Sequence, residues 1–244
     1  MAKSYFQFKQ FTIHQDHTAM KVSTDACVFG AIIAYRFNEL LTNTCRILDI
    51  GAGTGLLSLM LKQEMSEAVI DAVEIEEGAA KDAQLNFKNS NWSKDLMLHH
   101  ISAQEFKSDY QYEGVICNPP FFENQLKSPQ HQRLLARHTD QLTWSELVEV
   151  VNTHIKEDGL WALLLPVREW SLFAEVLGKD WHVVECHYVQ PFSNLKPKRV
   201  VVILQQKVKE EVEDTLIKYW PIYEERNIYS VDITNLLRDY YLYL

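Results

Sequence analysis

Hydrophobic positions in this chain follow two alternating periods from Arg46 onward. Short runs rich in β-branched residues predict strands, and between them lie stretches in which apolar residues recur at helical spacing. The predicted strands are residues 46–50, 69–74, 97–101, 114–117, 159–165, 182–189 and 199–205, and the predicted helices are residues 56–64, 78–89, 144–155 and 169–177. Such alternation is typical of a parallel sheet with helices on both faces.

The connection between the last two predicted strands, PFSNLKPK, is too short for a crossover helix and predicts an antiparallel pair. We therefore expect a Rossmann-like α/β fold with a seven-stranded, mostly parallel sheet whose last strand is antiparallel. By analogy between folds, this hairpin separates the class I methyltransferase version of the doubly wound architecture from the dehydrogenases.

Two further helices are expected at the flanks of the sheet. Thr24 or Asp25 is suited to cap a helix over residues 27–37. Ser230 or Asp232 is suited to cap a C-terminal amphipathic helix. The apolar positions of that helix are Ile233, Leu236, Leu237, Tyr240 and Leu244. With 244 residues the chain predicts one domain, an N-terminal segment 1–45 followed by a catalytic core 46–244.

Composition places the chain among soluble globular proteins. Apolar residues make up 47% and charged residues 23% of the chain. The longest apolar runs fall short of the roughly 20 residues that a membrane-spanning helix needs, and the N-terminal residues lack the apolar core of a secretory signal. We expect a cytoplasmic protein. Its four scattered cysteines and its histidines form no ligand cluster, so no metal site is predicted.

The net charge of −9 argues against a general nucleic-acid coat, because phosphates are repelled by an acidic surface. Local basic patches are still present. Lys196, Lys198 and Arg199 lie close together, and Arg133 and Arg137 are helix-spaced. We expect the first patch to contact phosphates, with an ordinary solvated turn as the alternative, and the second to be a further candidate near the substrate pocket.

A glycine-rich turn marks the predicted cofactor site. Asp49 ends the first strand, and Gly51, Ala52, Gly53, Thr54 and Gly55 lead into the helix that begins at Leu56. Glycine lets the backbone approach a ligand closely. Glu74 ends the second strand, where a carboxylate can accept hydrogen bonds from ribose hydroxyls. The spacing GxGxG followed by Leu56 departs from the GxGxxG of NAD sites, so the turn favours S-adenosylmethionine over a dinucleotide.

The sequence Asn118, Pro119, Pro120, Phe121 follows the fourth predicted strand. The Asn118 side-chain oxygen and the Pro119 carbonyl can accept hydrogen bonds from a conjugated NH₂ group and aim its lone pair at a sulfonium methyl. Phe121 can stack on a base, and the prolines stiffen the loop. The alternative is a plain strand-ending turn. We assign these four residues to catalysis, without a metal or a covalent intermediate.

The order of DIGAGTG, DAVEIE and NPPFF resembles amino-group methyltransferases acting on nucleic acid bases or on glutamine. The segment FQFKQFTIHQDHTAMKVSTDACVFGA narrows the likeness, which runs over nearly the whole chain, to bacterial valine-tRNA adenine-N6 methyltransferases. That resemblance implies methylation of the adenine 3′ of the anticodon, with the tRNA anticodon stem-loop as partner. It also implies that Lys21, Thr24 and Asp25 lie near the cofactor.

One position departs from the family. Where the family usually has an aspartate contacting the cofactor adenine, this chain has Ser102, a weaker acceptor. Three other functions stay open on the motif alone: methylation of release-factor glutamine, methylation of rRNA guanine N2, and RNA binding by a methyltransferase fold without turnover. The sequence leaves the exact tRNA, any need for prior modifications and the oligomeric state open.

Overall fold

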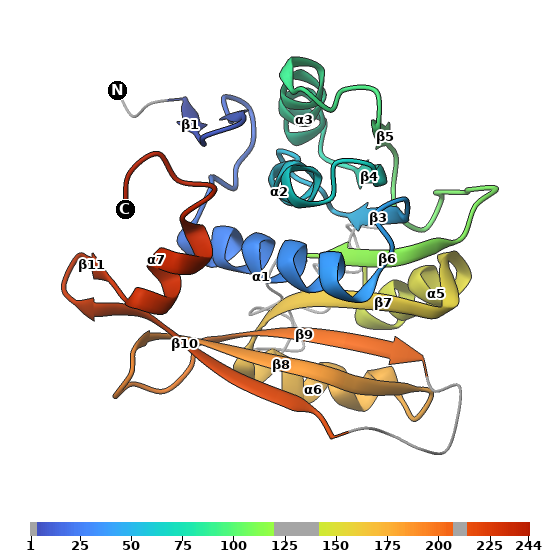
Figure 1. The fold of residues 1–244 in the computed structure, drawn as a ribbon. Helices are drawn as coiled ribbons and strands as arrows, with labels where there is room; N and C mark the ends of the chain where they lie inside the picture. Colours follow the sequence, from blue (N-terminus) through green and yellow to red (C-terminus); the bar gives the residue numbers. More distant parts are fainter. Residues whose placement is uncertain (1–3, 120–141, 207–213) are drawn as a thin grey trace, which may run out of the picture.

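The computed structural model describes residues 4–119, 142–206 and 214–244, and these build a nine-stranded sheet with a small separate hairpin. The hairpin is β1 (Tyr5–Gln7) and β2 (Thr12–His14). The sheet contains β3 (Arg46–Ile50), β4 (Val69–Glu74), β5 (Leu96–His100), β6 (Tyr112–Cys117), β7 (Ile155–Pro166), β8 (Trp181–Phe192), β9 (Arg199–Gln206), β10 (Leu216–Glu225) and β11 (Ile228–Tyr229). Their order is β11-β10-β8-β9-β7-β6-β3-β4-β5, and the sheet twists strongly between its two edges (Figure 1).

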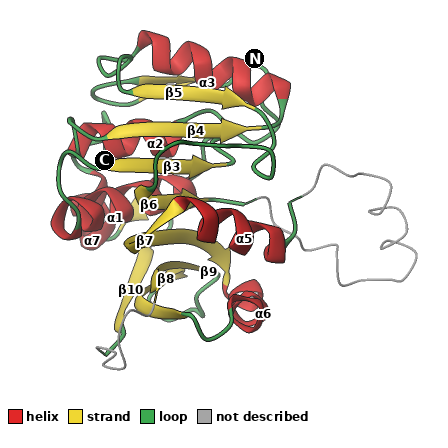
Figure 2. Cartoon of the chain, turned by 90° about the vertical axis from the view of Figure 1, so that its right-hand side faces the viewer, coloured by secondary structure: helices red, strands yellow, loops and turns green. Residues whose placement is uncertain are grey.

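Helices cover both faces of the sheet, as predicted (Figure 2). The described helices are α1 (Thr24–Leu40), α2 (Leu56–Glu64), α3 (Glu77–Asn89), α5 (Trp144–His154), α6 (Val167–Leu177) and α7 (Val231–Leu237). Apolar residues of α1, α2, α3 and α7 join one buried cluster, and those of α5 and α6 join a second cluster on the opposite face. The two clusters sandwich the sheet and hold its strand ends in fixed positions.

The sheet direction agrees with the expected class. β3, β4, β5, β6 and β7 are parallel neighbours, and β9 is antiparallel to both β7 and β8. All seven predicted strands are present, so the predicted Rossmann-like class is confirmed, while the predicted strand count was too low. The parallel strands end at one edge of the sheet, where Ile50, Glu74 and Cys117 are the last strand residues.

The two strands of the main sheet that the prediction missed are β10 and β11, and the separate hairpin of β1 and β2 was not predicted either. β10 pairs in parallel with β8, and on its other side β11 pairs only with its last residues, Tyr223 and Glu225. Pro221 interrupts the pattern of β10, and a proline is tolerated there because the strand is nearly an edge strand. Because of this proline, the pattern of hydrophobic positions does not predict a strand here.

Both flanking helices differ in detail from their predictions. α1 is capped by Ser23, whose side chain accepts a hydrogen bond from the Ala26 N–H at 3.3 Å, so neither Thr24 nor Asp25 is the cap. Ser230 caps α7 as predicted, at 3.2 Å from the Ile233 nitrogen. α7 ends at Leu237, so Tyr240 and Leu244 lie beyond it. Tyr240 is nevertheless buried, with its hydroxyl 3.3 Å from the Met60 carbonyl oxygen.

Candidate cofactor pocket and active site

The glycine turn after β3 has an open upper surface. Gly51 and Gly53 have positive φ angles of 70° and 58°, and a Cβ built on either glycine would meet nothing within 4 Å. Gly55, with φ 77°, differs, because a Cβ there would lie 2.3 Å from the Phe87 ring. Gly51 and Gly53 therefore leave room for a ligand over the turn, whereas Gly55 is required by the packing of α3 against α2.

Glu74 ties the turn to the end of β4. One carboxylate oxygen accepts the Gly53 N–H at 2.7 Å, and the other accepts the Glu76 N–H at 2.8 Å. The side chain is only 8% exposed and borders the cavity beside the turn. Each oxygen keeps a second lone pair, so Glu74 can accept further hydrogen bonds from a ligand.

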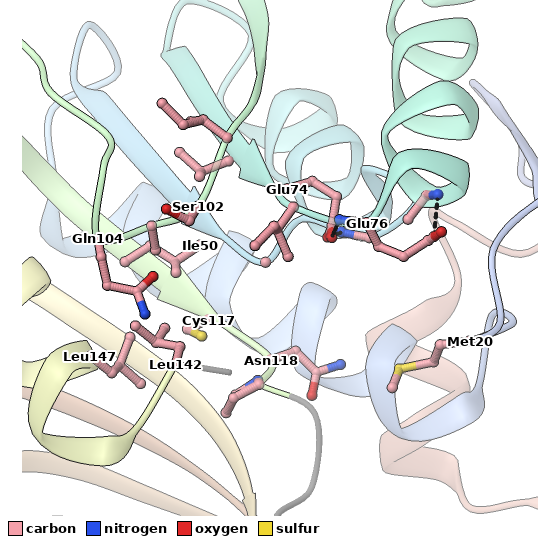
Figure 3. A pocket seen from close by; sticks show the side chains of 18 of the residues that line it. Met20, Ile50, Glu74, Glu76, Ser102, Gln104, Cys117, Asn118, Leu142 and Leu147 are labelled. Atoms are coloured by element: carbon pink, nitrogen blue, oxygen red, sulfur yellow. Dashed lines mark hydrogen bonds between the residues drawn. The ribbon is translucent and has the colours of Figure 1, made fainter. Parts of the chain in front are cut away.

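A cavity of about 480 Å³ lies over the turn and the strand ends. Its walls combine predicted site residues with apolar side chains, as Figure 3 shows. Of the predicted residues, the wall includes Gly51, Gly53, Glu74, Ser102, Asn118 and Pro119. The wall does not include Lys21, Thr24, Asp25, Asp49, Ala52, Gly55 or Leu56. The structure thus brings the ends of β3, β4, β5 and β6 to one pocket.

Asn118 directly follows β6 and carries the most unusual polar atom of the pocket. Its Oδ1 atom is buried and accepts no hydrogen bond within residues 4–119, 142–206 and 214–244. A buried acceptor without a partner costs free energy, on the order of 1–3 kcal/mol, unless a ligand satisfies it. In Figure 3 its amide group projects on the side of Met20. Pro120 and Phe121, the other two predicted catalytic residues, lie outside the described residues.

Asp49 lies beneath the turn. It is fully buried, and its Oδ2 accepts a hydrogen bond from the Ser58 hydroxyl at 2.6 Å. Burial raises the pKa of Asp49 to about 7, against the lowering effect of that hydrogen bond. Its position below the backbone indicates support of the turn from within.

Ser102, the departure from the family pattern, borders the cavity and caps the turn after β5. Its hydroxyl donates to the Glu105 carboxylate at 2.7 Å and accepts the Glu105 N–H at 3.3 Å. The hydroxyl hydrogen is therefore engaged within the turn. The neighbouring Ala103 and Gln104 also line the pocket.

The three N-terminal residues implied by the family resemblance order the backbone around the pocket. The Lys21 ammonium donates to the carbonyl oxygens of Gln15 and Thr18. The Asp25 carboxylate forms an ion pair with Arg199 at 3.5 Å. Thr24 hydrogen-bonds the Tyr229 side chain. Each residue therefore has a protein partner, and none of the three lines the cavity.

Sequence reasoning missed the residues that hold the N-terminal segment over the pocket. Gly78, Asp82 and Asn86 stand at i, i+4 and i+8 on one face of α3. The Asp82 Oδ2 atom accepts the N–H groups of His17 and Thr18, both at 2.9 Å, and Oδ1 contacts His17 Nδ1 at 2.8 Å.

Asn86 continues the same stripe. Its Oδ1 accepts the His14 N–H at 2.8 Å, and its amide donates to the His14 and Thr54 carbonyl oxygens, both at 2.9 Å. A Cβ at Gly78 would lie 2.8 Å from the His17 carbonyl oxygen, so the segment passes very close to the helix. Thr18, Ala19 and Met20 follow directly and form one wall of the pocket. In the sequence, the spacing of Gly78, Asp82 and Asn86 along α3 was the signal that could have indicated this contact with the N-terminal segment.

Asp82→Asn is expected to weaken ligand binding in this pocket about tenfold while changing kcat less than threefold. In the wild type, the Asp82 carboxylate accepts hydrogen bonds from backbone N–H groups, and hydrogen bonds to a charged group contribute about 1.5–3 kcal/mol each. The asparagine places an NH₂ group, which cannot accept, where one of the carboxylate oxygens stood. Calorimetric titration with S-adenosylhomocysteine measures the effect, and exposed Asp109→Asn is the matched control. Equal affinities of the two variants for S-adenosylhomocysteine would show that Asp82 does not support the pocket.

The charge state of Asp82 gives this anchor a pH dependence. Burial raises the pKa of Asp82, but the hydrogen bonds from His17 and Thr18 outweigh that effect and hold the pKa below its usual value. The stabilisation is therefore present at neutral pH and is lost as the pH falls through that depressed pKa.

Within the described ranges, no helix is both long and apolar enough to cross a membrane. The same part of the chain contains no group of three or more His, Cys, Asp or Glu side chains that could hold a metal ion. All four cysteines are buried free thiols.

Comparison with known proteins identifies the family. The Methyltransferase small domain family matches residues 30–165. A protein of Cytophaga hutchinsonii is 39% identical over 100% of both chains, and one of Vibrio campbellii is 38% identical over 97% of this chain and 95% of its own. A protein of Dyadobacter fermentans is 45% identical over 70% of this chain and 69% of its own. All three are named tRNA1(Val) (adenine(37)-N6)-methyltransferase.

Solved structures agree at the level of fold. A predicted O-methyltransferase from Agrobacterium tumefaciens superimposes with a TM-score of 0.62 at 12% identity, covering 87% of this chain and 95% of its own. A putative class I S-adenosylmethionine-dependent methyltransferase from Listeria monocytogenes gives 0.60 at 15% identity, covering 82% and 67%. The full-length likeness to the sequence relatives, on a methyltransferase fold, places this chain in the tRNA1(Val) (adenine(37)-N6)-methyltransferase family.

Proposed function

We propose that this protein transfers a methyl group from S-adenosylmethionine to the N6 amine of an adenine in tRNA, at position 37 of the valine tRNA that its relatives are named for. The observation that carries the proposal is Asn118 at the end of β6, which lines the same cavity as Glu74 and the open glycine turn and whose buried Oδ1 has no hydrogen-bond partner among the described residues. An acceptor without a partner in a pocket is suited to an N–H donor of the substrate.

The pocket residues fit S-adenosylmethionine. Gly51 and Gly53 leave open space for a ligand over the turn, and Glu74 offers lone pairs to ribose hydroxyls. Ile75, Ile101, Ala103, Leu142 and Leu147 provide apolar walls for a flat adenine ring. With the hydroxyl hydrogen of Ser102 engaged at Glu105, we assign contact with the adenine edge to the Ser102 oxygen or the backbone of this turn. When bound, the cofactor supplies an electrophilic methyl group on a sulfonium.

Asn118 and Pro119 orient the substrate amine in this proposal. The adenine N6 lone pair is delocalised into the ring, so the amine needs help to become a nucleophile. The Asn118 Oδ1 and the Pro119 carbonyl accept its two N–H hydrogens and direct the lone pair toward the methyl group. As the new N–C bond forms and the bond between the methyl group and sulfur breaks, N6 becomes cationic, and both acceptors would interact with it more strongly than with the neutral amine. N6 then releases one proton to solvent.

The remaining predicted residues have supporting roles in this proposal. Residues 1–45 form the segment that covers cofactor and substrate, and residues 46–244 form the catalytic core. Asp49, Ala52, Gly55 and Leu56 shape the turn, and Lys21, Thr24 and Asp25 order its surroundings. Pro120 and Phe121, which follow Pro119 in the sequence, are assigned to the substrate side, with Phe121 stacking on the target base.

Methylation of defined tRNA tests the function. Unmodified valine tRNA is incubated with the enzyme and labelled S-adenosylmethionine, and the product is mapped by mass spectrometry. We expect one methyl group on N6 of adenine 37, and none on the matched transcript with guanine at that position. Label in a release factor, or on N2 of guanine, would instead support the other substrates of this motif. Cofactor binding without transfer to any of them would indicate an RNA-binding protein.

A further inference from the structure

Three aromatic residues form a row across neighbouring strands at the end of the sheet. Tyr223 on β10 is paired in register with Phe192 on β8 and with Tyr229 on β11. The Phe192 and Tyr223 ring centroids are 5.9 Å apart, and the Tyr223 and Tyr229 rings are stacked at 5.3 Å and 13°. All three side chains are half-buried, so each keeps part of its surface in solvent. We call these three residues the aromatic row.

A positively charged connection adjoins the aromatic row. The segment 193–198 leads from Phe192 into β9 and carries Lys196 and Lys198, both exposed. Neither ammonium forms an ion pair with a carboxylate of the described residues. Residues 186–206 contain no Asp or Glu, in a chain whose net charge is −9. On the other side of the row, the end of β10 carries Glu224 and Glu225 and the turn to β11 carries Arg226, so the excess of positive charge lies on the β8–β9 side.

The aromatic row is linked through the start of α1 to the segment that lines the cofactor pocket. Tyr229 hydrogen-bonds Thr24, the first residue of α1, and the next residue, Asp25, pairs with Arg199 at the start of β9. Thr18, Ala19 and Met20, which line the pocket, lie a few residues before this helix start. Figure 1 shows β11, the start of α1 and the orange connection between β8 and β9 at the same end of the molecule.

We propose that the aromatic row and Lys196 and Lys198 together bind single-stranded RNA next to the target base. Unpaired bases stack on the exposed parts of Phe192 and Tyr223, and the two lysines neutralise the neighbouring phosphates. Because the surface lies at the same end of the sheet as the pocket, it is placed to receive the nucleotides that flank the reacting adenine. This inference rests on the proposed function. The positive charge on the β8–β9 side of the row is complementary to a phosphate polymer, whereas two copies of this chain, each with a net charge of −9, repel one another.

Two variants test the surface separately. Tyr223→Leu keeps apolar volume but removes a flat stacking face, and the double variant Lys196→Ala/Lys198→Ala removes two cations. We expect each to raise the KM for tRNA about tenfold, and the lysine variant to lower the salt slope of tRNA binding by about one to two. The Kd for S-adenosylhomocysteine is expected to stay within twofold. Unchanged melting temperatures establish that the variants are folded, and Phe192→Leu replaces Tyr223→Leu if that variant is not.

A matched charge control separates this surface from general electrostatics. Lys88→Ala/Lys94→Ala removes two exposed cations near the start of β5, at the opposite edge of the sheet, and is expected to leave the KM for tRNA unchanged. If the two double-lysine variants raise the KM for tRNA equally, the proposed RNA-binding surface is refuted, while the proposed function is not. The same holds if the Tyr223 and Lys196/Lys198 variants methylate tRNA like wild type. A change in oligomeric state in either variant would assign the surface to a second copy. Wild type that methylates no tRNA refutes the function itself.

Discussion

Asn118→Ala is expected to lower kcat for tRNA methylation by about 10²–10³-fold while the Kd for S-adenosylhomocysteine stays within about threefold. The substitution removes the buried Oδ1 that has no partner among the described residues. A preorganised polar group that interacts with charge developing in the transition state contributes an effect of this size. The residue borders the cavity, but our proposal assigns cofactor binding to Glu74 and the glycine turn, so we expect methyl transfer to be affected far more than cofactor binding.

Single-turnover methylation and calorimetric titration measure the two quantities in the same protein preparation. Asn152→Ala, at an exposed position on α5, is the matched control and is expected to behave as wild type. A kcat within threefold of wild type in Asn118→Ala would show that the amine is oriented by other groups. A parallel loss of cofactor binding would assign Asn118 to the cofactor rather than to the adenine.

The positions that sequence reasoning located correctly are those where local pattern and fold geometry coincide. The glycine turn and Asn118 each follow a run of apolar β-formers, and the carboxyl ends of parallel strands meet at one sheet edge. The predicted strand positions therefore indicated that Gly51, Glu74 and Asn118 lie close together, and all three line the same cavity. Helix α2 begins at Leu56 as predicted because Gly55 allows the left-handed backbone at its start.

The features that could not be predicted depend on contacts between distant segments. In the sequence, Asp82 resembles a solvated residue of an amphipathic helix, yet it is 1% exposed and binds backbone groups 64 and 65 positions earlier. The position of Lys21 has a similar cause, because its ammonium group donates hydrogen bonds to carbonyl oxygens of the same N-terminal segment. The spacing of Gly78, Asp82 and Asn86 marks one face of α3, but it does not indicate which backbone groups bind there. β10 was missed for a related reason, since its strand character comes from pairing with β8 and not from a regular alternation around Pro221.

Glu74→Ala is expected to raise the Kd for S-adenosylhomocysteine about 100-fold. The carboxylate accepts the N–H groups of Gly53 and Glu76, so its loss leaves two backbone donors unsatisfied and releases the turn from β4. It also removes the proposed acceptor for the ribose hydroxyls. Hydrogen bonds to a charged group contribute about 1.5–3 kcal/mol each, and every 1.4 kcal/mol corresponds to a tenfold change in binding.

Two comparisons separate these roles of Glu74. Glu74→Gln keeps one carbonyl acceptor and its amide replaces the other oxygen, so we expect an intermediate loss of about tenfold. Glu77→Ala removes an exposed carboxylate three residues away and is expected to leave the affinity unchanged. Calorimetric titration measures all three variants at one ionic strength. If Glu74→Ala bound the cofactor analogue as tightly as Glu77→Ala, the cavity over the glycine turn would not be the cofactor site, because no other carboxylate of the described residues bridges that turn and the end of β4.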